Sequence, residues 1–215
     1  SIGNFGTFQN LDRAFATIST EIMDVYIGRQ AVAWGSGRVL NPTDILAPFT
    51  FSALDTEDRF GIDALRIRIP VGTMGEFDTG YVLGKHLVFN KSAFFCRSQS
   101  NFMETDASAL VMVFRNNLLI GFDFVRAIGG AGFWLESAYV FPNTLADENQ
   151  LSDKYLRASV GLDYSFSGTT YGFVEYHFSQ AGTENPEDYF ANLIQPAYTD
   201  GAVYLMGRHY LAPGM

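Results

Sequence analysis

Residues 154–179, KYLRASVGLDYSFSGTTYGFVEYHFS, alternate between two kinds of side chain, and this alternation limits the fold more than any other feature of the chain. A period of two is the side-chain period of a β-strand. The pattern pauses at Ser167-Gly168-Thr169 and then resumes, which predicts two strands joined by a tight turn. One face of this hairpin is apolar, and the hairpin alone leaves open whether that face meets a protein interior or lipid.

The same reading extends along the chain and predicts about eleven strands. They are expected at residues 10–19, 21–34, 61–71, 77–84, 92–102, 107–115, 118–127, 132–141, 154–166, 171–179 and 202–211. The alternation is weakest in the first, sixth and eleventh of these ranges, and no amphipathic helix of convincing length is found. The sequence therefore predicts an all-β fold in one domain.

The amino-acid composition limits the environment in which such a sheet could lie and the partners that it could bind. Charged residues make up 17% of the chain, against a usual ~25%, while aromatic residues reach 15%. No stretch approaches the ~18 consecutive apolar residues of a membrane helix, so any membrane crossing would have to be made by strands. The formal net charge of −9 argues against nucleic acid as a partner, because a phosphate backbone requires a basic face.

Two further features bear on the compartment. Cys96 is the only cysteine, which excludes a disulfide framework and a cysteine-based metal cluster and favours a small apolar role for this residue. The opening SIGNFGTFQN has no basic region followed by an apolar one, so a secretion signal is either absent or already removed.

The connections between the expected strands alternate in length. Those after the first, third, fifth, seventh and ninth strands are short, whereas residues 35–60, 142–154 and 180–201 form long connections after the second, eighth and tenth. A membrane barrel has short turns at one rim and long loops at the other. The short link at residues 115–117 departs from this rule.

Aromatic side chains gather near the strand ends, as at Tyr139 with Phe141 and at Tyr164 with Phe166, where interfacial girdles of membrane barrels lie. Each alone is explained equally well by the strand preference of Tyr and Phe. Together with the low charge, however, they favour a transmembrane antiparallel up-and-down β-barrel. Because the first connection is short, at least one strand is expected before Ser1, and residues 1–215 are interpreted as a barrel domain incomplete at both ends, with at least twelve strands in total.

Residues 26–72 carry a family resemblance. They contain Gly-Arg-Gln at 28–30, Trp-Gly-x-Gly-Arg at 34–38, Asn-Pro-x-Asp at 41–44 and an acidic stretch at 57–66. This segment, about a fifth of the chain, resembles a group of poorly characterised porin-like outer-membrane proteins of Gram-negative bacteria. The resemblance implies a closed barrel in the outer membrane and names no substrate.

The same segment is expected to fold back into the barrel mouth. Asn41-Pro42-Thr43-Asp44 has the composition of a turn, and the apolar residues that follow it suit a loop packed against the wall. Its charged and polar side chains are expected either to pin this loop in an inward ion-pair ladder or to constrict the pore and select solutes. The residues in this group are Arg29, Arg38, Asn41, Asp44, Asp55, Glu57, Asp58, Arg59 and Asp63, with Arg66 and Arg68 beside them.

Catalysis and metal binding have little support. His177 lies near Glu175 and Ser179, but no nucleophile motif surrounds it, and the protein is not expected to be an enzyme. Acidic residues in the loops, such as Asp153 and Glu184, are interpreted as solvated side chains, and neither a metal site nor a cofactor site is predicted.

The expected function is passive diffusion of small solutes or ions through an outer-membrane pore, with the lipid bilayer and lipopolysaccharide as surroundings. Mixed charges on the lumen face predict weak ion selectivity. The expected lining residues are Arg66, Arg68, Asp123, Glu136, Arg157, Asp163, Glu175 and His177. A non-conducting barrel that docks a protein partner and a soluble β-sandwich binding module stay as alternatives, and a homo-oligomer is left open.

Overall fold

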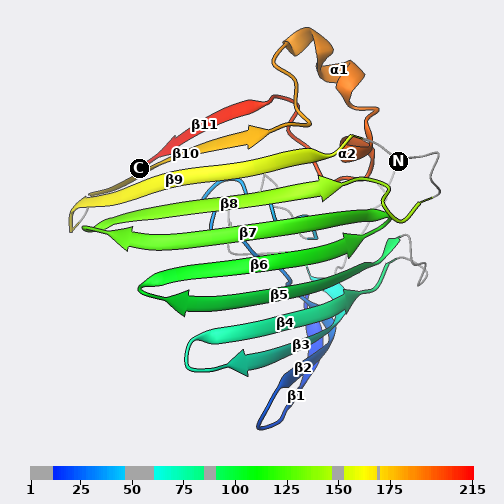
Figure 1. The fold of residues 1–215 in the computed structure, drawn as a ribbon, viewed down its shortest axis with the longest axis vertical. Helices are drawn as coiled ribbons and strands as arrows, with labels where there is room; N and C mark the ends of the chain where they lie inside the picture. The colour runs from blue at the N-terminus through cyan, green and yellow to red at the C-terminus, as the bar shows by residue number, and fades with distance from the viewer. Residues whose placement is uncertain (1–11, 47–60, 85–90, 147–152, 169) are drawn as a thin grey trace, which may run out of the picture.

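A computed structural model describes residues 12–46, 61–84, 91–146, 153–168 and 170–215 (Figure 1). Eleven strands form one antiparallel sheet in which every strand pairs with its neighbours in the sequence. The strands are β1 (Ala14–Ser19), β2 (Asp24–Gln30), β3 (Ile62–Val71), β4 (Gly75–Val82), β5 (Ala93–Phe102), β6 (Thr105–Phe114), β7 (Asn117–Ile128), β8 (Ala131–Phe141), β9 (Tyr155–Ser167), β10 (Thr170–Ser179) and β11 (His209–Gly214). The all-β prediction is confirmed, with the last strand several residues later than expected.

The sheet is curved and open. Among the described residues, β1 pairs only with β2 and β11 pairs only with β10, so the strands do not close into a barrel. They also lie in one sheet and not in two packed sheets, which differs from the arrangement of a β-sandwich.

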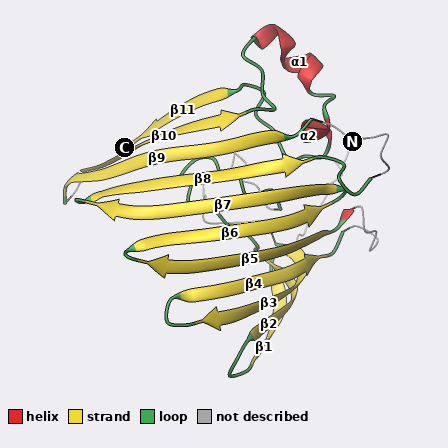
Figure 2. Ribbon diagram, viewed as in Figure 1, coloured by secondary structure: helices red, strands yellow, loops and turns green. Residues whose placement is uncertain are grey.

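The two ends of the strands differ in their connections. The turns that follow β1, β3, β5, β7 and β9 lie at one end of the sheet, which we call the turn end (Figure 2). The long connections from β2 to β3 and from β10 to β11 leave and rejoin the sheet at the other end, which we call the loop end. The link between β6 and β7 also lies at the loop end and is a tight turn at Arg115 and Asn116, where Arg115 takes a φ of 54°. The exception noted in the sequence is therefore real.

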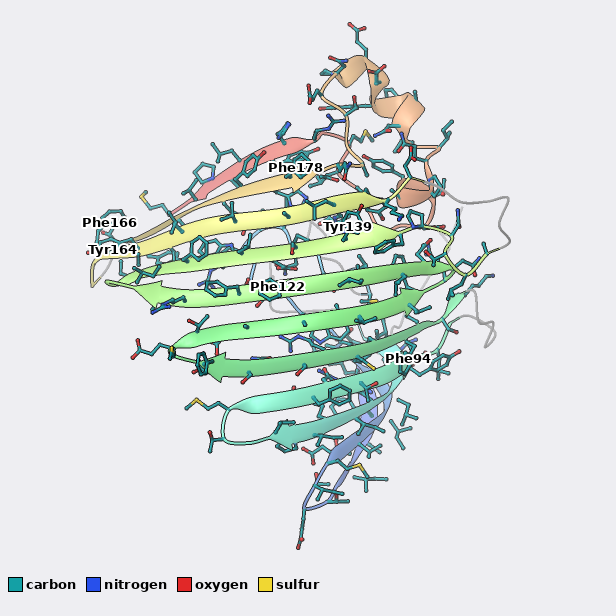
Figure 3. All side chains as sticks on the ribbon, in the orientation of Figure 1. Phe94, Phe122, Tyr139, Tyr164, Phe166 and Phe178 are labelled. Atoms are coloured by element: carbon teal, nitrogen blue, oxygen red, sulfur yellow. The ribbon has the colours of Figure 1, made fainter. Side chains whose placement is uncertain are left out.

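The two faces of the sheet also differ. The outward face exposes large apolar side chains, of which Phe122 is 45% exposed, Leu162 50% and Phe166 69% (Figure 3). The inward face, against which residues 32–46 lie, carries the residues of opposite parity, including Glu136 and Glu175. The apolar parity of the hairpin at residues 154–179 is thus the exposed one.

The hydrophobic core lies on the inward face. Residues 32–46, which we call the inward loop, place Val32 and Trp34 in one buried cluster with Phe95, Met112 and Leu119 of the sheet. This packing explains the weak alternation in β6, because both faces of that strand bear apolar side chains when the inward one contacts a loop and not water.

The connection between β10 and β11 contains three short helices: the 3-10 helix η4 (Pro186–Asp188), α1 (Tyr189–Asn192) and α2 (Pro196–Thr199). Buried Ala197 and Tyr198 attach this segment to the core at the loop end. In the described part of the chain, no helix has the length and apolar character needed to cross a membrane.

Candidate functional site

Glu136 of β8 is the first of two buried anchors for the inward loop. Its side chain is fully buried, and its two carboxylate oxygens accept four hydrogen bonds from the loop. The N–H groups of Ser36 and Gly37 donate to Oε2 at 3.0 and 3.1 Å, and the N–H and hydroxyl groups of Thr43 donate to Oε1 at 2.8 and 2.7 Å. Every contact is a donation to the carboxylate, an acceptor-only group when ionised.

Glu175 of β10 is the second anchor and holds the next part of the loop. The N–H groups of Arg38 and Leu40 donate to Oε2 at 2.6 Å and Oε1 at 2.8 Å, and the N–H of Val39 lies between both oxygens. The indole N–H of Trp134 completes the set at 3.0 Å. Two carboxylates on different strands therefore satisfy the backbone donors of a segment that has no regular secondary structure.

Glycine makes this close approach possible. Gly35 has a φ of +108°, and a Cβ on it would lie 2.5 Å from Oε2 of Glu136. A Cβ on Gly37 would lie 2.3 Å from the carbonyl oxygen of Leu40, in the same turn of the loop. The two glycines of the Trp-Gly-x-Gly-Arg motif thus allow backbone N–H groups to converge on a carboxylate.

Arg38 lies at the tip of the loop and is its most exposed charged group. Its guanidinium pairs with Asp163 of β9 at 3.0 Å and lies over the ring of Trp134, 5.3 Å from the ring centroid. Asp163 also accepts bonds from the hydroxyl of Tyr171 and the N–H of Gly132. The guanidinium is thereby held over the inward face with half of its side chain accessible.

The ring of Trp134 requires a glycine opposite it on β9. A Cβ on Gly161 would lie 2.1 Å from Cζ2 of Trp134, so Gly161→Ala is expected to push the indole away from Glu175 and to lower the free energy of unfolding by about 1–3 kcal/mol. Urea unfolding of the purified protein measures this loss. Gly168→Ala is the matched control, since nothing lies within 4 Å of a Cβ there. Equal stability of the two variants would contradict this packing.

The other end of the inward loop meets two ion pairs that join arginines of β3 to carboxylates of β4. Arg66 pairs with Asp78 at 2.6 Å, and the indole N–H of Trp34 donates to the same carboxylate at 3.4 Å. Arg68 pairs with Glu76 one step nearer the turn end. The loop therefore crosses the inward face from β4 to β10.

The remaining predicted lining residues also lie on the inward parity. His177 is buried, and its Nδ1 is 2.8 Å from the hydroxyl of Ser159, which also donates to the carbonyl of Leu40. Buried Arg157 donates to the carbonyl of Ala202 at 2.7 Å. Asp123 is buried opposite Glu136 in the register of β7 and β8. These residues share one face, although most of them contact protein groups and little solvent.

The expected ion-pair ladder is only partly present. Arg29 and Asp63 pair at 2.9 Å, but the register of β2 and β3 puts both on the parity of exposed Leu65, so they lie on the outward face and not the inward one. Asn41 and Asp44 are buried and form a turn through the hydrogen bond from the N–H of Asp44 to the carbonyl of Asn41, as the Asn-Pro-x-Asp pattern predicts. Asp55, Glu57, Asp58 and Arg59 lie outside the described residues.

Sequence reasoning gave no site role to several residues that attach the loop. Trp34 and Thr43 of the loop were noted only as members of motifs, and Trp134 and Ser159 of the sheet were not named as site residues. All four are buried, and they bond Asp78, an anchor or the loop backbone. The sequence did contain a signal for these contacts: the chain has only two tryptophans, and one of them, Trp34, lies between Gln30 and Gly35 of the motif segment. Within the part of the chain that the structure describes, no group of three or more His, Cys, Asp or Glu side chains could hold a metal ion.

No family model, no curated protein and no solved structure matches this chain. The resemblance to porin-like outer-membrane proteins therefore stays a prediction, and the case for a function depends on the geometry alone.

Proposed function

We propose that this sheet is the wall of an outer-membrane β-barrel that lets small solutes or ions diffuse passively past the inward loop. One observation carries the proposal: the two faces of the sheet are reversed relative to those of a water-soluble sheet. Large apolar side chains are exposed on the outward face, whereas charged side chains and a loop occupy the inward one. A water-soluble sheet exposes its polar face, while a sheet in lipid exposes its apolar face.

Strand length supports the same proposal. The strands from β5 to β10 contain 10 to 13 residues each, and a tilted strand of ~9–11 residues suffices to cross a bilayer. Exposed Tyr139 lies near the loop end, and exposed Tyr164 and Phe166 lie near the turn end, which agrees with aromatic girdles at two interfaces (Figure 3).

Closure of the barrel needs more than the described strands. In an up-and-down antiparallel sheet the first and eleventh strands run in the same direction, so β1 and β11 cannot complete an antiparallel ladder with each other. A barrel of at least twelve strands, an even total, would satisfy both edges.

Selectivity would be weak in this pore. The accessible part of the inward face carries both signs, with Arg38 beside Asp163 and Arg68 beside Glu76. Paired charges leave little net field along a path, so we expect a small reversal potential in a salt gradient.

Single-channel recording of the full-length protein in a planar bilayer tests the proposal. We expect stable conductance steps, with larger or noisier steps for Glu175→Gln, because that change removes an acceptor from the three loop N–H groups. A protein that is folded and inserted but gives no steps would overturn the pore.

A second candidate is a non-conducting barrel that acts as a scaffold for a protein partner. It is favoured by the apolar packing of Val32 and Trp34 with Phe95 and Met112, which fills part of the inward side with buried side chains. Absent conductance together with correct insertion would select this candidate.

A further inference from the structure

A polar pocket of about 740 Å³ opens at the loop end of the sheet. It lies between the start of β9, the residues that follow β10, and α1. Its volume falls within the range of ~300–1,000 Å³ usual for small-molecule sites. The inward loop and its two anchors contribute no residue to its lining.

Hydrogen bonds fix the walls of this pocket. The side-chain amide of Asn192 donates to the carbonyl of Ala181 at 2.7 Å, and the hydroxyl of Tyr198 donates to the carbonyls of Ala181 and Leu205. A Cβ on Gly182 would lie 2.1 Å from the carbonyl oxygen of Gly207, so the two sides of the connection are in close contact. A cavity held in this way is formed before any ligand arrives, which lowers the cost of binding.

The lining presents donors and acceptors of the amide type. Gln180 uses Oε1 to accept from the N–H of Leu156, and within the described residues no hydrogen bond engages its Nε2. Gln195 donates through Nε2 to Asn192, which leaves its Oε1 as an acceptor. Amide groups that offer both roles match hydroxyl groups, which also donate and accept.

The charges around the pocket nearly cancel. Arg208 donates to Glu184 at 2.9 Å and to the carbonyl of Gly182 at 3.1 Å, and Lys154 lies over the ring of Phe141 beside Asp153. A site for a free anion would leave more cationic charge unpaired. The lining therefore favours an uncharged polar ligand.

We propose that this pocket binds a neutral saccharide. A free sugar and the sugar portion of a membrane glycolipid offer the same uncharged hydroxyl groups. At the loop end the pocket would be accessible to either. The inference goes beyond the proposed pore, because a sugar site at the loop end does not require an open lumen.

The test uses full-length protein in detergent and saturation-transfer difference NMR with three probes: maltose, glucuronic acid and the neutral glycolipid lactosylceramide. We expect saturation transfer to maltose and no transfer to glucuronic acid. Transfer to the sugar of lactosylceramide without transfer to maltose would assign the site to a glycolipid. Transfer to neither neutral probe, or equal transfer to glucuronic acid, would overturn the proposal.

Two variants locate the binding. Gln180→Glu keeps an acceptor for the N–H of Leu156 but removes the amide donor, and Gln195→Ala removes the second amide; each is expected to weaken binding about fivefold to tenfold. Gln99→Ala on β5 is the matched control, because Gln99 lies outside the pocket lining, and this variant should bind like the wild type.

Unchanged affinity in both pocket variants would overturn the site. Conductance is not part of this readout, so a failed pore and a failed sugar site are distinguishable.

Discussion

Glu136→Gln is expected to release the inward loop and to lower the free energy of unfolding by about 2–4 kcal/mol. Each carboxylate oxygen of Glu136 accepts from two loop donors, and either placement of the glutamine amide puts an NH₂ group against at least one backbone N–H. A buried donor left without an acceptor costs ~1–3 kcal/mol, and the neighbouring bonds of the loop weaken with it.

Limited trypsin digestion of the detergent-solubilised protein measures the release directly. Arg38 follows Gly37 in the loop, and its N–H is fixed to Glu175, so the wild type should resist cleavage after Arg38 while Glu136→Gln is cut there. Glu76→Gln is the matched control, because Glu76 bonds the side chain of Arg68 and no part of the loop. If both variants were cleaved at the same rate, Glu136 would not be an anchor.

Phe122→Lys is expected to cost about 2–4 kcal/mol if the outward face lies in lipid. Phe122 is in the middle of β7 on the outward face, where a cation would stand at the centre of the bilayer (Figure 3). Urea unfolding of the protein inserted in lipid vesicles gives the difference in free energy.

Leu118→Lys, on the same strand and the same face, provides the comparison. Leu118 lies one residue from the start of β7 at the loop end, where a lysine reaches the interface and costs only ~0–1 kcal/mol. A face in water would give two small and equal effects, because exposed substitutions usually change stability by less than ~0.5 kcal/mol. Equal costs would therefore remove the main support for the membrane barrel.

Strand periodicity predicted the sheet because it is a local property of the chain. All eleven strands were expected, and the exposed parity of Leu162 and Phe166 was separated correctly from the parity of Arg157 and Asp163. The last strand was misplaced, since Ala202 and Val203 are apolar for another reason: they are buried in the connection before β11.

The anchoring of the loop could not be predicted in the same way. The faces of Glu136 and Glu175 were expected, but their partners are mostly backbone N–H groups, which every residue carries and which leave no mark in the sequence. Arg29 and Asp63 were placed on the wrong face because charge alone does not specify parity near the end of a strand. The pairing register of β2 and β3 decides on which face Arg29 and Asp63 lie, and this register depends on both strands together.

The separation in sequence between the loop and its anchors has a consequence for folding. Arg38 and Glu175 are 137 positions apart, and Thr43 and Glu136 are 93 apart, so the loop is made early in the chain and can dock only when β8 and β10 are in place. Such contacts close late because long chain segments must be ordered first. Protection of Arg38 from trypsin should therefore be one of the last events of refolding. Its time course would report when β8 and β10 have joined the sheet.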